Sequence, residues 1–443
     1  MNTKIYDYLK EYEASGKMRC HMPGHKGRSL SDYPELQKIY ALDITEIKGA
    51  DSLFEADGII SESEEKMAEL YGTAATLYSA GGSTSCIQAM LGAMKAENRK
   101  VFAIRNVHRA FLNSCVLLGI DAEWIMPDYT SGILSGTVRP EAVEEALKGT
   151  ENACLYVTSP DYTGRIADIA SLAEICHKYG AVLIVDNAHG AHLNFMNDSS
   201  HPIFLGADMC CDSAHKMLPA LTGAAMLHMR DKKYKNVLRE YMSIFTSTSP
   251  SYLILMSLDI CTDYISKRIR KDISAILPEI KKFRDHFSKK LSFAESEPFH
   301  ITINAAESGY DGIEFAEFLR ENGCECEYAD SQIVILLLSP VTTVSELTEM
   351  KNIIEKVLEA VEKKERKIIK AMPELPKKVM GIREAAFSTM EEVNVENSLG
   401  RICAAVKVPC PPAVPIAASG EVIDENCINI FKNYGISSVF VVK

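Results

Sequence analysis

The sequence contains no apolar run approaching the roughly 18 residues that a membrane-spanning helix requires. Its start, MNTKIYDYLKEYEASGK, also lacks the apolar core of a secretory signal peptide. Basic residues are not in excess, because 48 lysines and arginines stand against 60 acidic residues, for a net charge of −12. That balance argues against nucleic acid and anionic membrane as partners, and it is compatible with a cationic small substrate. We therefore expect a cytoplasmic protein.

The cysteines do not form the pattern of a disulfide framework. There are 13 of them, and Cys154, Cys210 and Cys211 lie in apolar runs, where a thiol behaves as a small buried hydrophobic group. Cys324 and Cys326 lack a second pair at zinc-ligand spacing, so we expect no metal site there. At 443 residues and 47% hydrophobic composition, the chain is long enough for two domains.

Short apolar runs alternate with helical patterns between about residues 70 and 230. The helical patterns include 84–97 and 167–180, in which apolar residues recur at intervals of three and four. Near-continuous apolar strands separated by helices predict an α/β fold whose mostly parallel sheet is covered on both faces. The predicted strands are 75–80, 100–105, 122–127, 153–158, 181–186, 207–213 and 223–228.

The rest of the chain changes character after about residue 293. Residues 231 to about 293 are predicted to be mostly helical, with the polar segment TSTSPSY (246–252) as an interruption. After it, shorter strands and helices predict a smaller α/β domain, and the charged run at 356–370 is interpreted as the solvated end of a long helix. The expected strands are 299–304, 324–329, 332–339 and 437–442, and the expected helices include 311–322 and 343–364.

Ligands of an open parallel sheet bind beyond the carboxyl ends of its strands, so the loops after the predicted strands are the candidates for a site. SAGGSTS (79–85) joins a strand to a helix, and its glycines allow a tight turn. Ser83 and Thr84 place hydroxyl and N–H groups at the helix N-terminus, which suits a phosphate. Simple N-capping of the helix would explain the same residues.

A second loop, DNAHGAH (186–192), follows the most hydrophobic strand. A carboxylate at the end of a buried strand is costly unless it is paired, so Asp186 is expected to have a cationic partner. His189 and His192 follow at one-turn spacing. A metal site formed by Asp186, His189 and His192 is the competing interpretation, although no further acidic ligand with suitable spacing is evident.

The third loop, CDSAHKMLP (211–219), contains a lysine among apolar residues. Lys216 either extends its amine to the surface, as most lysines do, or is bonded to a partner in an apolar pocket. Ser213 and His215 beside it can bind phosphate. Together with His108 after the strand at 100–105, these loops describe a pocket for pyridoxal phosphate, with Lys216 as its Schiff-base lysine and Asp186 at the ring nitrogen.

These motifs also resemble a known family. HMPGHKG (21–27), DITEIKGADSL (43–53), GGSTS, RNVHRA, DNAHGAH, DSAHK and TSTSPSY stand in the order found in the Orn/Lys/Arg decarboxylases, which share the fold-type I architecture of aspartate aminotransferase. The resemblance covers nearly the whole chain, to GRICAAVKVPCPPAVPIAASGEVI near its end. The chain is similar to the shorter, biosynthetic-type members, which lack a receiver-like N-terminal domain.

The resemblance implies a role for each matching residue. Lys216 would carry the cofactor, Asp186 would hold its ring nitrogen, His108 would stack on the ring and His189 would lie beside it. The phosphate would be held by Ser83, Thr84, Ser213 and His215, and in similar enzymes the segment matching TSTSP reaches the neighbouring subunit's phosphate. Ser247 or Thr248 would then complete a partner's site, and the active unit would be at least a homodimer.

By the same resemblance, the reaction is decarboxylation of arginine, lysine or ornithine to a polyamine-pathway amine and CO2. The alternatives are another fold-type I reaction, transamination or Cα–Cβ cleavage, and a protein that binds pyridoxal phosphate without turnover. Glu46, Asp51 and Glu421 are candidates for binding the substrate's distal cation, and each could equally be a surface charge.

The sequence departs from the family pattern at two places. Asn187 replaces the glutamate of the usual DEAHGAH, and Cys410 and Ala413 give PCPPA where PYPPG is usual. These departures leave the cofactor assignment intact and the substrate open. The expected domains are an N-terminal arm lining the active site (1–60), a cofactor-binding large domain (61–293) and a small C-terminal domain (294–443).

Overall fold

The protein is described by a computed structural model that covers residues 3–364, 374–405 and 414–443. The chain divides into two compact units, the first formed by Met1–Ala96 and Ile184–Asp272 and the second by Glu97–Leu183 and Ile273–Lys443. Within the described ranges, none of the helices combines the length and the apolar character needed to cross a membrane.

The central sheet has the strand order β1-β9-β8-β7-β6-β2-β3. Its parallel pairs are β7 with β8, β2 with β6 and β2 with β3, whereas β9 is antiparallel to both β1 and β8. The prediction of an α/β fold with a mostly parallel sheet is confirmed, with β9 as the exception to parallel pairing. The strands are β1 (Ala75–Ser79), β2 (Lys100–Ile104), β3 (Glu123–Ile125), β6 (Ala153–Thr158), β7 (Val182–Asp186), β8 (Met209–Asp212) and β9 (Ala225–Met229).

In the first unit, helices pack around β1, β8 and β9. α4 is largely buried and contacts α9, β9 and β8, while α10 contacts α1 and α3. Asp259 on α10 attaches the start of the chain, because its Oδ2 accepts hydrogen bonds from the backbone N–H groups of Ile5 (2.8 Å) and Tyr6 (3.0 Å). The helices are α1 (Lys4–Ala14), α2 (Gln37–Leu42), α3 (Ile59–Tyr71), α4 (Gly82–Ala96), α8 (Ala214–Met217), α9 (Lys235–Phe245) and α10 (Tyr252–Lys267), and α11 (Ile269–Phe287) begins here.

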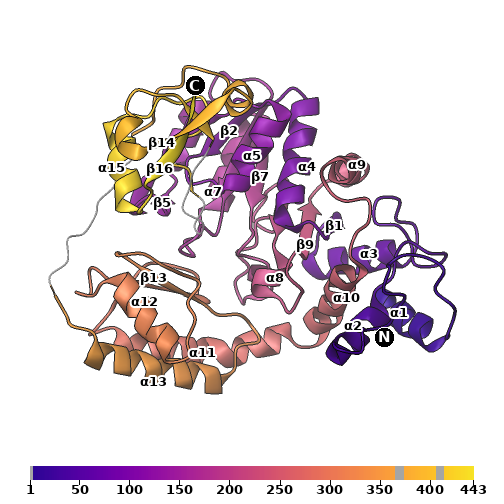
Figure 1. Cartoon of the computed structure of the whole chain (residues 1–443). Coiled ribbons are helices and arrows are strands. Elements are labelled where there is room, and N and C mark those ends of the chain that lie inside the picture. The colour runs from indigo at the N-terminus through magenta and orange to yellow at the C-terminus, as the bar shows by residue number, and fades with distance from the viewer. Residues whose placement is uncertain (1–2, 365–373, 406–413) are drawn as a thin grey trace. The chain divides into compact units, whose positions relative to one another are not determined.

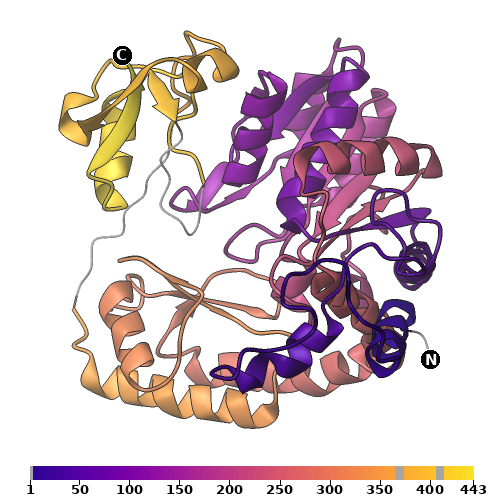
Figure 2. The same cartoon turned by 45° about the vertical axis from the view of Figure 1, so that its right-hand side comes forward.

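The second unit contains two further sheets. One has the order β10-β11-β13-β12, and Figure 1 shows α12 and α13 lying beside it. The other, β14-β16-β15, shares an apolar core with α15. Figure 2 shows this part of the chain as its yellow end. Their elements are β10 (Ser292–Phe293), β11 (His300–Asn304), α12 (Gly312–Glu321), β12 (Tyr328–Ala329), β13 (Val334–Leu337), α13 (Val344–Ala360), β14 (Met390–Asn394), β15 (Cys403–Ala405), α15 (Glu425–Asn433) and β16 (Ser438–Val442).

The remaining elements of the second unit were not predicted, apart from α7. Among them, β4 and β5 form an antiparallel hairpin. These elements are α5 (Arg109–Leu118), β4 (Asp128–Ser131), β5 (Ser135–Thr137), α6 (Pro140–Leu147), α7 (Ile169–Lys178) and α14 (Ile382–Ala386).

Several predicted elements are longer than the observed ones, among them a strand and a helix of the second unit. The strand expected at 324–329 is only β12, and the chain leaves a turn at Gly323 (φ +87°) just before CECE. The helix expected at 343–364 ends at Ala360 in α13. Most of the charged run at 356–370 continues beyond it, and residues 365–370 lie outside the described residues.

Candidate active site

Strand directions bring three of the predicted loops to one edge of the sheet in the first unit. β7 and β8 are parallel, and β9 is antiparallel to β8 and to β1, so the carboxyl ends of β1, β7 and β8 and the amino end of β9 share that edge. SAGGSTS follows β1, DNAHGAH follows β7, and the segment with Lys216 joins β8 to β9. This is the edge at which ligands of open α/β sheets bind.

The turn after β1 is built around a serine hydroxyl. Ser79 Oγ accepts a hydrogen bond from Gly81 N (3.0 Å) and lies 2.6 Å from Ser85 Oγ. Gly82 has a φ of +70°, a left-handed conformation that favours glycine, and its N–H donates to the carbonyl of Gly223 (2.8 Å). These contacts hold the first residues of α4 against the segment that follows Lys216.

Ser83 and Ser213 meet although 130 residues separate them. Ser213 Oγ donates to Ser83 Oγ across 2.9 Å, so hydroxyls from two of the predicted phosphate-binding loops face one another. Thr84, also predicted here, is exposed at the start of α4. His215 is anchored differently, because its Nδ1 lies 2.8 Å from the carbonyl of Ala224. Burial lowers the pKa of His215, which favours a neutral imidazole near pH 7.

Lys216 lies next to His189. Its Nζ is 2.9 Å from His189 Nε2, and the imidazole is buried with 5% exposure. The lysine itself is half-buried. An amine in direct contact with an imidazole can exchange a proton with it.

Asp186 ends β7 with 2% exposure. Its Oδ1 accepts from Ala188 N at 3.2 Å and lies 3.7 Å from the thiol of Cys211, the residue paired with it on β8. The position at a buried strand end agrees with the predicted location. A cationic partner for this carboxylate remains a prediction.

His108 belongs to the second unit, where it caps a helix. It is exposed, and its Nδ1 accepts a hydrogen bond from Ala110 N at 3.1 Å as the N-cap of α5. This capping is a structural role that the sequence analysis did not consider. Stacking on a cofactor ring stays a prediction.

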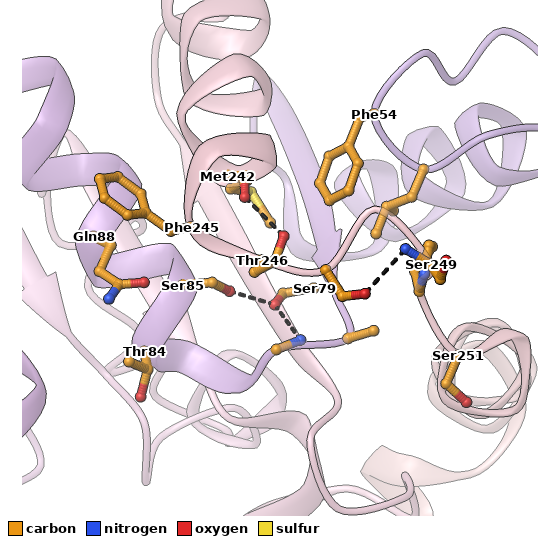
Figure 3. Close-up of a pocket in the computed structure, with 15 residues that line it drawn as sticks. Phe54, Ser79, Thr84, Ser85, Gln88, Met242, Phe245, Thr246, Ser249 and Ser251 are labelled. Atoms are coloured by element: carbon orange, nitrogen blue, oxygen red, sulfur yellow. Dashed lines mark hydrogen bonds between the residues drawn. The ribbon is translucent and has the colours of Figure 1, made fainter.

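TSTSPSY borders a cavity of about 430 Å³ in the first unit. Figure 3 shows the hydroxyls of Ser79 and Ser85 on one side and the 246–251 segment on the other. Thr246 packs against the glycine turn so tightly that a Cβ on Gly81 would lie 2.8 Å from its Cγ2. The lining residues are Leu53, Phe54, Ser79, Ala80, Gly81, Thr84, Ser85, Gln88, Met242, Phe245, Thr246, Ser247, Ser249, Pro250 and Ser251. Ser247 and Thr248 are both exposed.

The three acidic candidates for a substrate cation are engaged within the protein. Glu421 is 2% exposed and forms a bidentate ion pair with Arg105, at 2.8 and 2.6 Å. Asp51 Oδ2 accepts from the N–H groups of Gly58 (2.9 Å) and Ile60 (2.9 Å), and so organises the start of α3. Glu46 accepts from Ser52 Oγ at 2.8 Å. The alternative that all three are surface charges is therefore wrong for Glu421.

Sequence reasoning missed a buried polar cluster directly beneath this edge. Asp212, at the end of β8, is fully buried, and its Oδ2 lies 3.1 Å from His201 Nε2 and 3.3 Å from His228 Nε2. Its other oxygen accepts from Asn187 Nδ2 at 2.7 Å. The aromatic ring of Tyr71 stacks on His228 with centroids 4.4 Å apart. An aspartate in the apolar strand MCCD was the one signal available, since its partners lie far away in sequence.

The electrostatics of this cluster favour an ionised Asp212. Burial opposes ionisation, but the imidazoles of His201 and His228 more than offset it, and the pKa of Asp212 lies well below its ordinary value. Burial lowers the pKa of His228, and Asp212 offsets this only in part. The ring nitrogen Nδ1 of His228 lies 2.8 Å from Thr76 Oγ1, which can donate to it and leave the imidazole proton on Nε2, facing Asp212.

The residues with spacing suited to a metal ion are not the ones considered from the sequence. Among the described residues, Asp186, His189 and His192 do not form a group with metal-ligand spacing, whereas the ligand atoms of His201, Cys210 and Asp212 lie within 4.8 Å of one another. Cys410 and Ala413 lie outside the described residues, so their departure from the family pattern has no structural account.

Sequence comparisons with known proteins agree on similarity to the Orn/Lys/Arg decarboxylases. The family model described as "Orn/Lys/Arg decarboxylase, major domain" matches residues 3–306. An arginine decarboxylase of Bacillus subtilis (strain 168) is 26% identical over 97% of this chain and 93% of its own length. An arginine decarboxylase of Bacillus anthracis is 26% identical over 96% and 91%.

Solved structures agree on the fold. The lysine decarboxylase LdcF of Francisella novicida superposes with a TM-score of 0.82 at 16% identity, covering 100% of this chain and 81% of its own. The archaeal selenium transferase SepSecS superposes with a TM-score of 0.57 at 15% identity, covering 80% and 89%. These matches confirm the predicted fold-type I architecture.

Proposed function

Because the chain belongs to the Orn/Lys/Arg decarboxylase family, we propose that it removes the α-carboxylate of arginine and releases agmatine and CO2. Family membership confirms the predicted resemblance, the prediction of a decarboxylase acting on a basic amino acid, and pyridoxal phosphate as cofactor. In the sequence comparisons, coverage favours arginine over lysine, whereas the lysine decarboxylase structure that covers 100% of the chain is only 16% identical and shows the fold alone. Relatives named arginine decarboxylase match 97% and 96% of the chain, whereas one named lysine decarboxylase matches 57%.

The residues at the sheet edge fit the cofactor. The hydroxyl of Ser83 at the start of α4 faces that of Ser213 before α8, a lysine amine lies beside an imidazole, and a buried carboxylate ends β7. These groups match the cofactor's phosphate, aldehyde and ring nitrogen. We assign Lys216 to hold the aldehyde and Asp186 to hold the ring nitrogen. Ser83, Thr84, Ser213 and His215 are assigned to the phosphate, and His108 to the ring face.

When bound, pyridoxal phosphate supplies an electron sink for the pair left on Cα as CO2 departs. The protein's own task is then to return a proton to Cα. Lys216 Nζ is the proposed donor, and His189 Nε2, 2.9 Å away, the group that resupplies it. The balance is one proton taken up and one CO2 released for each agmatine formed. The 2.9 Å contact between Lys216 and His189 is the observation that carries this assignment.

Three finer features belong to the proposal as well. The active unit is a homodimer in which Ser247 or Thr248 reaches the partner's phosphate, supported by the exposure of both residues and by the place of Ser247 in the cavity lining. The domains are residues 1–60, 61–293 and 294–443. The protein works in the cytoplasm in polyamine biosynthesis, as its resemblance to biosynthetic-type enzymes suggests.

The experiment that tests the reaction uses the purified holoprotein with arginine, lysine and ornithine in separate incubations. CO2 and the amine product are measured by mass spectrometry, and agmatine with equimolar CO2 is the expected outcome. A keto acid without CO2 would establish transamination instead. Cadaverine or putrescine as the main product would retain the decarboxylase and refute the choice of substrate.

A matched pair of lysine variants tests the assignment of Lys216. Lys216→Ala is expected to lose all measurable turnover and the borohydride-stable cofactor adduct at residue 216, detected by peptide mass spectrometry. Lys66→Ala is the control, because Lys66 forms an exposed surface pair with Glu69. An adduct found on another lysine of the wild-type protein would refute the assignment.

A further inference from the structure

The buried cluster beneath the sheet edge explains why this chain has an amide at position 187. Asn187 is 0% exposed and is tied to β8 twice, through its backbone N–H to the carbonyl of Cys211 (3.0 Å) and through Nδ2 to Asp212 Oδ1 (2.7 Å). The amide must present its nitrogen to the carboxylate, because the reverse orientation would place two oxygens against one another. A glutamate or aspartate at 187 would bring a second carboxylate to the same buried place.

The surroundings of Asp212 do not favour a second carboxylate beside it. Its Oδ2 already faces the imidazoles of His201 (3.1 Å) and His228 (3.3 Å), so Asn187 is the group that faces its Oδ1. Two carboxylates in contact away from water cannot both be ionised, so one would have to take up a proton. The neutral amide at 187 and the ionised carboxylate at 212 therefore form a matched pair.

The pair also joins the two strands that present the candidate catalytic residues. Asn187 directly follows Asp186 at the end of β7, and Asp212 directly precedes Ser213, whose hydroxyl contacts Ser83. The space around the amide is equally restricted, since a Cβ on Gly190 would lie 2.0 Å from Asn187 Oδ1. A shift of this pair would move both strand ends.

We propose that Asn187 and Asp212, held by His201 and His228, act as positioning residues that set the spacing between Asp186 and the segment carrying Lys216. The proposal rests on the proposed function for its consequence at the cofactor, and on the geometry of the first unit for its consequence in stability. Residues 187 and 212 act as a pair: a carboxylate at one position requires a neutral amide at the other.

The test is a charge exchange between the two positions. Asn187→Asp, Asp212→Asn and the double variant are compared with Asn194→Asp, a control in which Asn194 Nδ2 contacts the backbone carbonyls of Leu70 and Tyr71 rather than a carboxylate. The midpoint of thermal unfolding is measured without cofactor at pH 5 and pH 7. The dissociation constant for pyridoxal phosphate is measured by absorbance titration, with no substrate present.

Asn187→Asp is expected to lower the unfolding midpoint by at least about 5 °C at pH 7 and to weaken cofactor binding about tenfold. The loss should be smaller at pH 5, because the added carboxyl must stay protonated in the folded state. Its folded-state pKa is then raised, and stability falls as pH rises above the ordinary carboxyl value. The double variant should recover most of both losses, since the amide introduced at position 212 can turn its oxygen to the imidazoles and its nitrogen to the carboxylate introduced at position 187.

Three results would overturn the proposal. One is an Asn187→Asp protein that unfolds and binds cofactor as the wild type does at both pH values. Another is a double variant no better than Asn187→Asp. The third is one equivalent of bound metal by elemental analysis of the holoprotein, because His201, Cys210 and Asp212 would then be ligands rather than hydrogen-bond partners.

A second set of variants keeps the test informative if Asn187→Asp does not accumulate. Asn187→Ala removes the donor without adding a charge, and it should lower the midpoint equally at pH 5 and pH 7. Gly190→Ala displaces the amide with no change of charge, and it should weaken cofactor binding without the pH dependence. None of these measurements uses turnover. The positioning role can therefore be refuted while the proposed decarboxylation holds, and the decarboxylation can be refuted while the positioning role holds.

Discussion

Two buried carboxylates, one in each compact unit, are neutralised in different ways. Glu421 in the second unit pairs with the guanidinium of Arg105, which also lies over the Trp124 ring at 4.4 Å, and it accepts from Ala418 N at 2.7 Å. Asp212 in the first unit is held by an amide and two imidazoles. A guanidinium keeps its charge at any accessible pH, whereas burial lowers the pKa of the His228 imidazole.

The two carboxylates therefore differ in how their surroundings respond to pH. The Arg105–Glu421 pair joins the end of β2 to the segment before α15, and its bidentate geometry occupies both carboxylate oxygens that a substrate cation would need. The Asp212 cluster lies next to residues that we assign to a cofactor, and its stability depends on protonation. We therefore expect substitutions in the Arg105–Glu421 pair to affect folding alone. Substitutions in the Asp212 cluster should affect folding and cofactor binding.

The largest expected effect is at Glu421. Glu421→Gln leaves the buried guanidinium of Arg105 without its counter-charge and should lower the free energy of unfolding by about 3–5 kcal/mol, as measured by urea denaturation. Replacing both residues with methionine should recover much of that loss. A variant as stable as the wild type and unable to bind arginine would instead restore Glu421 as a substrate ligand.

Asp212→Asn should have a smaller effect, about 1.5–3 kcal/mol, because it removes hydrogen bonds to a charged group and leaves no unpaired guanidinium behind. Hydrogen exchange followed by mass spectrometry can localise this change to peptides containing β7 and β8. Equal loss of protection in peptides of the second unit would contradict the separation of the two clusters.

The two regions should also differ in their response to acid. His228 has a lowered pKa, so the unfolded chain binds a proton below its ordinary value of about 6.5 and the first unit loses stability as pH falls from 7 to 5. The depressed pKa of Asp212 adds a further loss below about pH 4. Hydrogen exchange at pH 5 and 7, corrected for intrinsic rates, is expected to show earlier opening around β8. His228→Asn should flatten this dependence, and an unchanged profile would argue against it.

The smallest effect is expected at an exposed carboxylate. Glu69 pairs with Lys66 at 2.8 Å on the surface of α3, where solvent and salt screen the attraction. Glu69→Gln should leave the unfolding midpoint within experimental error of the wild type. A clear loss at this position would show that burial is not what distinguishes the three carboxylates.

The sequence predicted the strands of the central sheet and the loops that carry the candidate site because both are local signals. Apolar runs of strand length mark β1, β7 and β8, and a lysine next to Met217 and Leu218 is conspicuous in any context. The antiparallel direction of β9 was not predictable, because its apolar run looks the same in either direction. The helix cap formed by His108 was not predicted, because the residue was considered only as a candidate for stacking on a cofactor ring.

What the sequence by itself determined was which segments would become strands and which loops would carry hydroxyl, imidazole, amine and carboxylate groups. These follow from burial and backbone period, which act over a few residues. Only the tertiary structure decided which charges meet. Arg105 lies 316 residues from Glu421, and Asn187 lies 25 residues from Asp212, and no local pattern links such partners. Electrostatic pairing depends on distance in space and on exclusion of water, and both exist only after the chain has folded.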